Sequence, residues 1–393
     1  MTMNVKRKPK IVILGMMSRI PVAGNIWLVA HYMVGLRRLG YDPYYVEAHA
    51  RTPSMLMKSN DDDSSELAAG FICNVMRRFD FGDRWAFHAL HDDGRCFGLS
   101  ESELKCLYAD ADLIVNLHGS TMPKPEHYAT DRLIYLETDP VELEVELYNG
   151  DEKAREFLAP HRAFFTWGEN YGNPDCRVPV PDGFDVRPTR APVVLDFWDS
   201  ADPTGGDAFT TIGNWKQSWR EVKFQGDVYY WSKHFEFLKI IDLPCHTSQP
   251  FELALSSYDS KTRQMLNEHG WRVVDAMDFS TDVDAYLGYI GSSRGECTVA
   301  KDQNIRLRSG WFSERSAQYL AAGRPVITQE TGFSNILPTG EGLFAFSTME
   351  DILNAVDRIN SDYPASCRAA KEIAREYFSY DVVLPPLLEA AGV

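Results

Sequence analysis

Short runs of apolar residues alternate with amphipathic stretches along nearly the whole chain. Helical patterns between the runs include residues 26–39, which end at Gly40, and residues 313–322, which end at Gly323. Buried strands are predicted at residues 10–16, 44–47, 112–117, 132–136 and 163–167, and again at 209–212, 251–255, 271–274, 297–300, 325–328 and 343–346. This alternation predicts α/β architecture with parallel sheets, and ligands at the carboxyl ends of the strands.

The pattern is interrupted once, between Pro174 and Pro203. Six prolines fall in this stretch, and few helix signals accompany them. With 393 residues the chain is long enough for two α/β domains. We therefore predict a first domain over residues 1–175, a proline-rich linker over 176–206 and a second domain over 207–375. The tail, residues 376–393, is expected to pack back on the first domain.

The net charge, the cysteines and the length of the apolar runs limit which partners and cellular locations are expected. The formal net charge of −16 argues against nucleic acid or an anionic membrane as the main partner, although a local basic patch remains compatible with phosphate. Seven scattered cysteines without a Cys-x-x-Cys pair indicate a reducing compartment and give no signal for structural zinc. No apolar run reaches the ~20 residues of a membrane helix. A cytoplasmic location is expected.

The segment from Gly295 to Phe346 has the features of an anion site. Ser313 is a good helix N-cap, and Arg306, Arg308 and Arg315 lie close by in the sequence. A helix start offers free N–H groups and a partial positive charge, which suit a phosphate or diphosphate. Alternatively, the segment is a βαβ unit that binds no nucleotide, in which the same caps only stabilise the helix.

The run YLAAGRPVITQETGF, residues 319–333, resembles the donor-site segment of GT-B glycosyltransferases. The resemblance implies two Rossmann-like domains with a cleft between them, a nucleoside diphosphate sugar as donor (UDP or dTDP), a small-molecule or glycan acceptor, and no metal. By the same resemblance, the donor site is expected to comprise Gly213, Asn214, Lys216, Asp275, Lys301, Arg308, Ser309, Gly310, Ser313, Gln318, Gln329, Glu330, Thr331 and Gly332.

Two departures from the family pattern concern the donor side and the catalytic base. Gln318 stands where many members carry a ribose-binding glutamate, and Gly310 and Gln318 replace both acids of the retaining Glu-x7-Glu motif. Around Gly24 the chain resembles the family's Gly-His loop, but Asn25 occupies the histidine position and cannot act as a general base. Asn25 either contacts the acceptor or caps the helix, and His31 is expected in the core.

Other base candidates stand at strand ends. His118, followed by Gly119, ends one predicted strand, and Glu137 and Asp139 end the next. Glu169 and His49 hold similar positions. A carboxylate here can deprotonate an acceptor hydroxyl if burial raises its pKa. Alternatively, Asp139 forms a turn with Pro140 and Glu169 caps a helix. The Asp-x-Asp pairs at 110–112 and 282–284 are interpreted as structural.

These features favour a glycosyltransferase. A GT-B-shaped sugar-nucleotide epimerase is one alternative. A non-catalytic sugar-nucleotide or glycan-binding protein is another, because Asn25 and Gln318 replace reactive residues.

Overall fold

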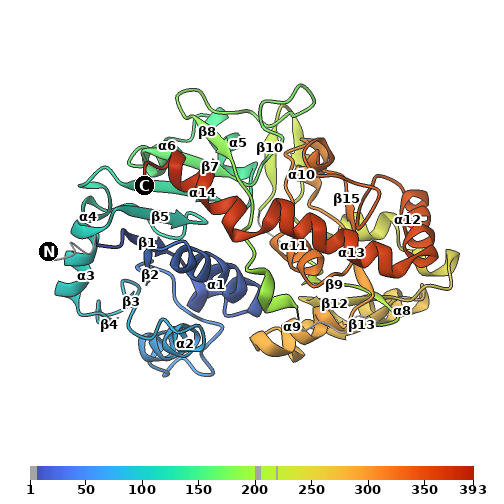
Figure 1. Ribbon diagram of the computed structural model, residues 1–393, viewed down its shortest axis with the longest axis horizontal. Coiled ribbons are helices and arrows are strands. Elements are labelled where there is room, and N and C mark those ends of the chain that lie inside the picture. The colour runs from blue at the N-terminus through green and yellow to red at the C-terminus, as the bar shows by residue number, and fades with distance from the viewer. Residues whose placement is uncertain (1–6, 200–204, 218–219) are drawn as a thin grey trace, which may run out of the picture.

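The computed structural model describes residues 7–199, 205–217 and 220–393, and it contains two separate sheets joined side by side (Figure 1). The first sheet has eight strands in the order β4-β3-β2-β1-β5-β6-β7-β8. Its strands are β1 (Lys10–Leu14), β2 (Asp42–Glu47), β3 (Trp85–His88), β4 (Cys96–Gly98), β5 (Leu113–Leu117), β6 (Leu133–Glu137), β7 (Ala163–Thr166) and β8 (Val186–Pro188). All neighbours pair in parallel except β3 and β4.

The second sheet has six parallel strands in the order β13-β12-β9-β14-β15-β16. They are β9 (Phe209–Asn214), β12 (Phe251–Ser256), β13 (Arg272–Asp275), β14 (Gly295–Thr298), β15 (Val326–Gln329) and β16 (Leu343–Phe346). A small antiparallel hairpin, β10 (Val222–Phe224) with β11 (Asp227–Tyr229), stands apart from both sheets. The predicted class, α/β with two parallel sheets, is confirmed.

Helices connect the strands of both sheets. In the first half they are α1 (Ala23–Arg38), α2 (Ser64–Arg78), α3 (Glu101–Asp110), α4 (Pro125–Tyr128), α5 (Glu142–Tyr148) and α6 (Glu152–Leu158). In the second half they are α7 (His234–Lys239), α8 (Ser260–Glu268), α9 (Val283–Gly291), α10 (Asp302–Arg306), α11 (Glu314–Ala321), α12 (Met349–Ser361) and α13 (Tyr363–Ile373). The last helix, α14 (Tyr380–Ala390), returns to α1 (Figure 1). Within the described ranges, no helix is long and apolar enough to cross a bilayer.

The sequence pattern did not predict β3 or the two edge strands, β4 and β8. Each has three or four residues, too few to establish a periodicity. The strand at residues 163–167 was expected to be the last of its half, but β8 pairs beyond it. Pro188 ends β8, where its missing N–H is tolerated because nothing pairs on the outer side.

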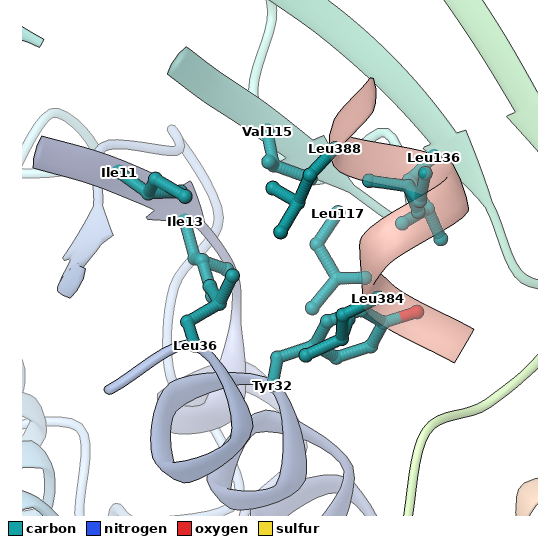
Figure 2. A pocket seen from close by; sticks show the side chains of 10 residues that line it. Ile11, Ile13, Tyr32, Leu36, Val115, Leu117, Leu136, Leu384 and Leu388 are labelled. Carbon is teal, nitrogen blue, oxygen red and sulfur yellow. The ribbon is translucent and has the colours of Figure 1, made fainter. Parts of the chain in front are cut away.

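Helix α14 closes the first half by packing its leucines over α1 and the sheet. Gly35 of α1 allows this approach, because a Cβ there would stand 2.8 Å from Leu384 Cδ1. Figure 2 shows Leu384 and Leu388 opposite Ile13, Tyr32 and the strand residues around a small apolar cavity of about 10 Å³. The cavity is so small that the docked helix is close-packed there.

We expect Leu384→Ala to lower the free energy of unfolding by about 2–3 kcal/mol, because it removes a buried side chain and enlarges this cavity. Urea denaturation followed by circular dichroism measures the change. Val382→Ala, at a side chain of the same helix that is 45% exposed, is the matched control and should change stability by less than about 0.5 kcal/mol. Equal effects of the two variants would show that α14 is not packed as described.

Candidate functional site

The carboxyl ends of strands from both sheets meet at one junction. The segment that follows β7 runs alongside the loop between α10 and α11: Asn170 N–H donates to Ser309 O at 3.1 Å, and Arg177 N–H donates to Leu307 O at 2.8 Å. Trp311 Nε1 also donates to Thr138 O, at 3.0 Å. The loop that precedes α11 is therefore held by the first half of the chain.

Two glycines make this close contact possible. Gly310 has φ +82°, and a Cβ there would overlap the backbone nitrogen of Asn170. Gly332 has φ +99°, and its Cβ would stand 2.6 Å from Asn170 Nδ2. A side chain at either position would strain the backbone, and at Gly310 it would also push against the backbone of Asn170 in the first half.

Three cationic side chains of the second half converge at this junction. Lys301 follows β14, Lys233 precedes α7, and Arg315 is in the first turn of α11. Arg315 donates to Ile212 O at 2.6 Å and to Glu296 at 2.7 Å, which fixes its guanidinium against the adjacent strands β9 and β14. Glu296 raises the pKa of Arg315 although burial opposes the shift.

Lys233 and Lys301 differ in how their charges are balanced. Lys301 is only 8% exposed and forms an ion pair with Asp139 of the first half. The ion pairs of this region leave Lys233 without a carboxylate partner among the described residues. Burial, followed by the neighbouring charges of Arg315 and Lys301, lowers the pKa of Lys233 to about 7. An incompletely balanced positive cluster of this kind favours an anion.

Two tryptophans complete the surroundings of these lysines. The Lys301 ammonium lies 3.1 Å from the centroid of the Trp231 ring, and that of Lys233 lies 5.5 Å from the centroid of Trp311. Both distances are within the range of cation–π attraction. The aromatic walls also limit access of water, which strengthens electrostatic interactions at the site.

Helix α11 presents its start to the same place. As predicted, Ser313 caps it, accepting from Arg315 N–H at 3.3 Å, and Gly323 follows its end with φ +69°. The free N–H groups of the first turn add a partial positive charge to the cluster.

Most other donor-site candidates lie around this cluster with contacts of their own. Arg308 pairs with Asp175 at 2.6 Å and lies 3.7 Å from Glu330, and it lowers the pKa of Asp175 to about 2. Ser309 Oγ donates to Asn304 at 2.8 Å, and Thr331 Oγ1 donates to Trp311 O at 2.7 Å. The Arg308–Asp175 pair joins the two halves, whereas Ser309 and Thr331 make contacts within the second half, and the roles of all three in ligand binding stay predictions.

Further donor candidates follow the strand ends. Gln329 accepts from Ala300 N–H at 3.2 Å and donates to Glu236 at 2.8 Å. Gln318 is buried under Tyr286, whose hydroxyl donates to it at 3.2 Å, and its Nε2 has no partner in the described chain. Gly213 and Asn214 end β9 and Lys216 follows them, whereas Asp275 ends β13 and caps the next turn through Met277 N–H.

Two of the predicted base candidates lie at the junction itself. Asp139 touches the donor-side cation Lys301, and its other oxygen, Oδ1, is buried without a partner in the described chain. The turn that carries it is strained, since Val141 has φ +98°. His118, also left-handed with φ +60°, contacts Thr138 Oγ1 through Nδ1. Burial lowers its pKa to about 4, so it is neutral and a weak base at pH 7.

The remaining acidic candidates are engaged away from these cations. Glu137 is buried, accepts from Thr166 Oγ1 and faces Glu144. Burial, followed by the charge of the neighbouring Glu144, raises the pKa of Glu137 well above its ordinary value. Glu169 pairs with Arg190 at 3.0 Å, and burial nevertheless raises its pKa.

The acceptor-side candidates occupy the corresponding edge of the first sheet. Asn25, in the first turn of α1, donates its amide to Ile20 O at 3.1 Å, and Gly24 lies against Tyr286 of α9. His49 is buried beside Glu47. Gly119 adopts φ +60° directly after His118. His31, on α1, is a buried core residue as predicted, and Val194 N–H donates to its Nδ1 at 3.0 Å.

Sequence reasoning missed Lys233 and Trp231. Both lie in the stretch between β11 and α7, which matches no motif, and their importance arises only from the distant residues that folding places around them. The Asp-x-Asp pairs are structural, as interpreted: Asp112 pairs with Arg7, and Asp282 caps α9. In the described part of the chain, no group of three or more acidic, histidine or cysteine side chains is arranged to hold a metal.

The chain is similar in structure to several glycosyltransferases. An alpha-glucosyltransferase in complex with UDP and a 13-mer DNA aligns with a TM-score of 0.60 at 11% identity, covering 98% of this chain and 100% of that one. HepE from Anabaena in complex with UDP and glucose gives 0.54 at 11% identity, over 97% and 99%. Sucrose-phosphate synthase from Thermosynechococcus elongatus gives 0.54 at 14% identity, over 98% and 100%.

At these identities the likeness shows the fold alone, and it confirms the expected GT-B fold over nearly the full chain. No protein-family model matches the chain, and no curated protein matches it in sequence.

Proposed function

We propose that this protein transfers a sugar from a nucleoside diphosphate sugar to an acceptor hydroxyl or amine at the junction of its two sheets. The observation that carries the proposal is the group of Lys233, Lys301 and Arg315 at the start of α11. Asp139 and Glu296 balance Lys301 and Arg315, whereas Lys233 forms no ion pair in the described chain, and its partly desolvated charge suits a diphosphate that leaves with negative charge during glycosyl transfer. Structural neighbours that bind UDP support UDP as the first donor nucleotide to test, with dTDP next.

In this proposal one half of the chain binds the acceptor and the other half binds the donor. Residues 1–175 would bind the acceptor, 176–206 would link the halves, 207–375 would bind the donor, and 376–393 would return to the first half as α14 does. Asp139, next to Lys301, is the side chain best placed to accept a proton from the acceptor. His118, Glu137 and Glu169 remain the other candidates.

A product analysis with labelled donor tests the reaction class. Incubation of the full chain with UDP-glucose and dTDP-glucose, each with and without a panel of acceptors, should give a labelled glycoside. Formation of an isomeric sugar nucleotide would favour an epimerase, and binding without turnover would favour a binding protein. DNA belongs in the acceptor panel, because one neighbour was solved with it, although the charge of −16 predicts that it will not react.

The low pKa of Lys233 predicts that UDP binding depends on pH. Below pH 7 the ammonium is charged in the free protein, whereas above pH 7 it must take up a proton to pair with the diphosphate. UDP affinity should therefore fall by up to about tenfold per unit between pH 7 and pH 9. Calorimetric titration at four pH values measures it. Lys233→Met should bind UDP more weakly and lose this slope, and an unchanged slope in the variant would contradict the assignment.

A further inference from the structure

A second group of cationic side chains lies at the acceptor edge of the first sheet, and a buried network holds it in place. Glu47, fully buried at the end of β2, accepts from Ser18 N–H at 2.9 Å, from Tyr45 OH at 2.7 Å and from Ser18 Oγ. His49 Nδ1 accepts from Arg51 N–H at 3.3 Å, so its Nε2 carries the hydrogen and donates to Glu47 at 3.1 Å. The loops after β1 and β2 are thus fixed to one carboxylate.

Two arginines project from these fixed loops, and each crosses to a side chain of the other loop. Arg19, next to Ser18, reaches the second loop, where its Nη1 donates to Ser54 Oγ at 2.8 Å. Arg51 reaches the first loop, where its Nη1 lies 3.0 Å from Met16 Sδ. Neither guanidinium forms an ion pair within the described ranges. The crossing brings two unneutralised positive charges to the same edge of the sheet.

The group continues toward the donor cations. Arg220, from the other half, stacks on the Trp231 ring at 3.6 Å and pairs with Glu142, and Lys301 contacts the same ring. Arg51 is exposed at the surface, but partial desolvation of its guanidinium, followed by the charges of Arg19 and Arg220, lowers its pKa, so both of these arginines lie close enough to act on Arg51. Arg19 and Arg51 therefore lie near the donor cations, but they belong to loops of the first sheet and not of the second.

Like charges held together without counter-ions raise the free energy of the unliganded protein, and an anion relieves this cost. In the proposed function, the donor diphosphate is already bound by Lys233, Lys301 and Arg315. Guanidinium groups bind phosphate and carboxylate through paired N–H donors, whereas a neutral acceptor gains little from them. The second group thus indicates a second anion, bound where an acceptor would lie.

We propose that Arg19 and Arg51 bind a phosphate or carboxylate group of the acceptor, so that the acceptor class is anionic. This inference rests on the proposed function, because it takes the first sheet as the acceptor side. Each arginine contributes a positioning contact and takes no part in the chemical step.

Titration calorimetry on the 393-residue chain, saturated with UDP to fill the donor site, tests the inference. The probes are glucose 6-phosphate, glucuronate and the neutral methyl glucoside. Both anionic probes, or one of them, should bind at least tenfold more tightly than methyl glucoside. Arg19→Gln and Arg51→Gln should each remove most of this advantage and leave UDP affinity unchanged. Arg155→Gln, at an exposed arginine of α6 without an ion pair in the described chain, should retain it.

A difference between glucose 6-phosphate and glucuronate would identify which anion the site accepts. Equal affinities for charged and neutral probes, or an anionic advantage that survives both substitutions, would overturn the inference. Thermal melting of each variant checks that it is folded. Arg51→Lys keeps the charge and loses the paired N–H donors, so its affinity for the anionic probe should lie between those of the unmodified chain and Arg51→Gln. If UDP itself fails to bind the unmodified chain, the proposed function fails, and this result is distinct from a lack of preference among acceptors.

Discussion

Lys301→Ala should weaken UDP binding by about 100-fold or more. The substitution removes a charged hydrogen-bond donor to the diphosphate, an interaction of about 1.5–3 kcal/mol. It also leaves the Asp139 carboxylate, now without its ion-pair partner, beside the site of a bound anion. Both effects act in the same direction, so the loss should exceed that for Lys233→Met. Isothermal titration with UDP measures it.

Lys261→Ala is the matched control, because Lys261 is exposed on α8 of the same half and forms no ion pair in the described chain. It should bind UDP like the unmodified protein. In the double variant Lys301→Ala, Asp139→Asn, the repulsive carboxylate is gone, so part of the lost affinity should return. If the double variant binds no better than Lys301→Ala alone, the carboxylate does not oppose the diphosphate.

Asp139→Asn should separate binding from turnover. In the free protein Asp139 forms an ion pair with Lys301, so a diphosphate must compete with this carboxylate for the Lys301 ammonium. Asparagine has the same size but no charge, and UDP affinity should therefore increase, by about tenfold. Glycosyl transfer should fall by about 10²–10⁴-fold, because an amide cannot accept the acceptor's proton.

Parallel UDP titrations and transfer assays on Asp139→Asn distinguish this account from a merely structural role. A structural residue would lose affinity and activity together. Glu169→Gln is a useful comparison, because Glu169 is held by Arg190 away from the donor cations, and it should leave UDP affinity unchanged. Weaker UDP binding in Asp139→Asn would contradict the competition described here.

The parts of the fold that could be predicted from sequence have strong local signals. The caps at Ser313 and Gly323 fixed α11 within a residue of its observed bounds, and the apolar run at 343–346 matched β16. By contrast, β3, the edge strands β4 and β8, and the two strands of the β10–β11 hairpin have only three or four residues each. They are formed by pairing with other segments, which local sequence pattern does not record.

The candidate site was predictable to the level of strand ends and no further. Sequence reasoning placed Asp139 and Lys301 at strand ends, but their contact joins positions 162 residues apart. Arg308 was predicted as a donor-site residue, and in the structure it pairs with Asp175, whose position beside it no sequence motif indicates. The environment of Lys233 likewise depends on burial and on neighbours from β14 and α11, which only the tertiary structure assembles.

The most direct test of the central claim compares nucleoside diphosphates with their nucleosides in the unmodified chain and in Lys233→Met. Calorimetric titrations with UDP and uridine, and with dTDP and thymidine, isolate the contribution of the diphosphate. If Lys233, Lys301 and Arg315 bind it, one diphosphate should bind at least 100-fold more tightly than its nucleoside, and Lys233→Met should reduce that ratio about tenfold or more with nucleoside affinity unchanged. An unchanged ratio in the variant, or equal binding of diphosphate and nucleoside by the unmodified protein, would contradict the account.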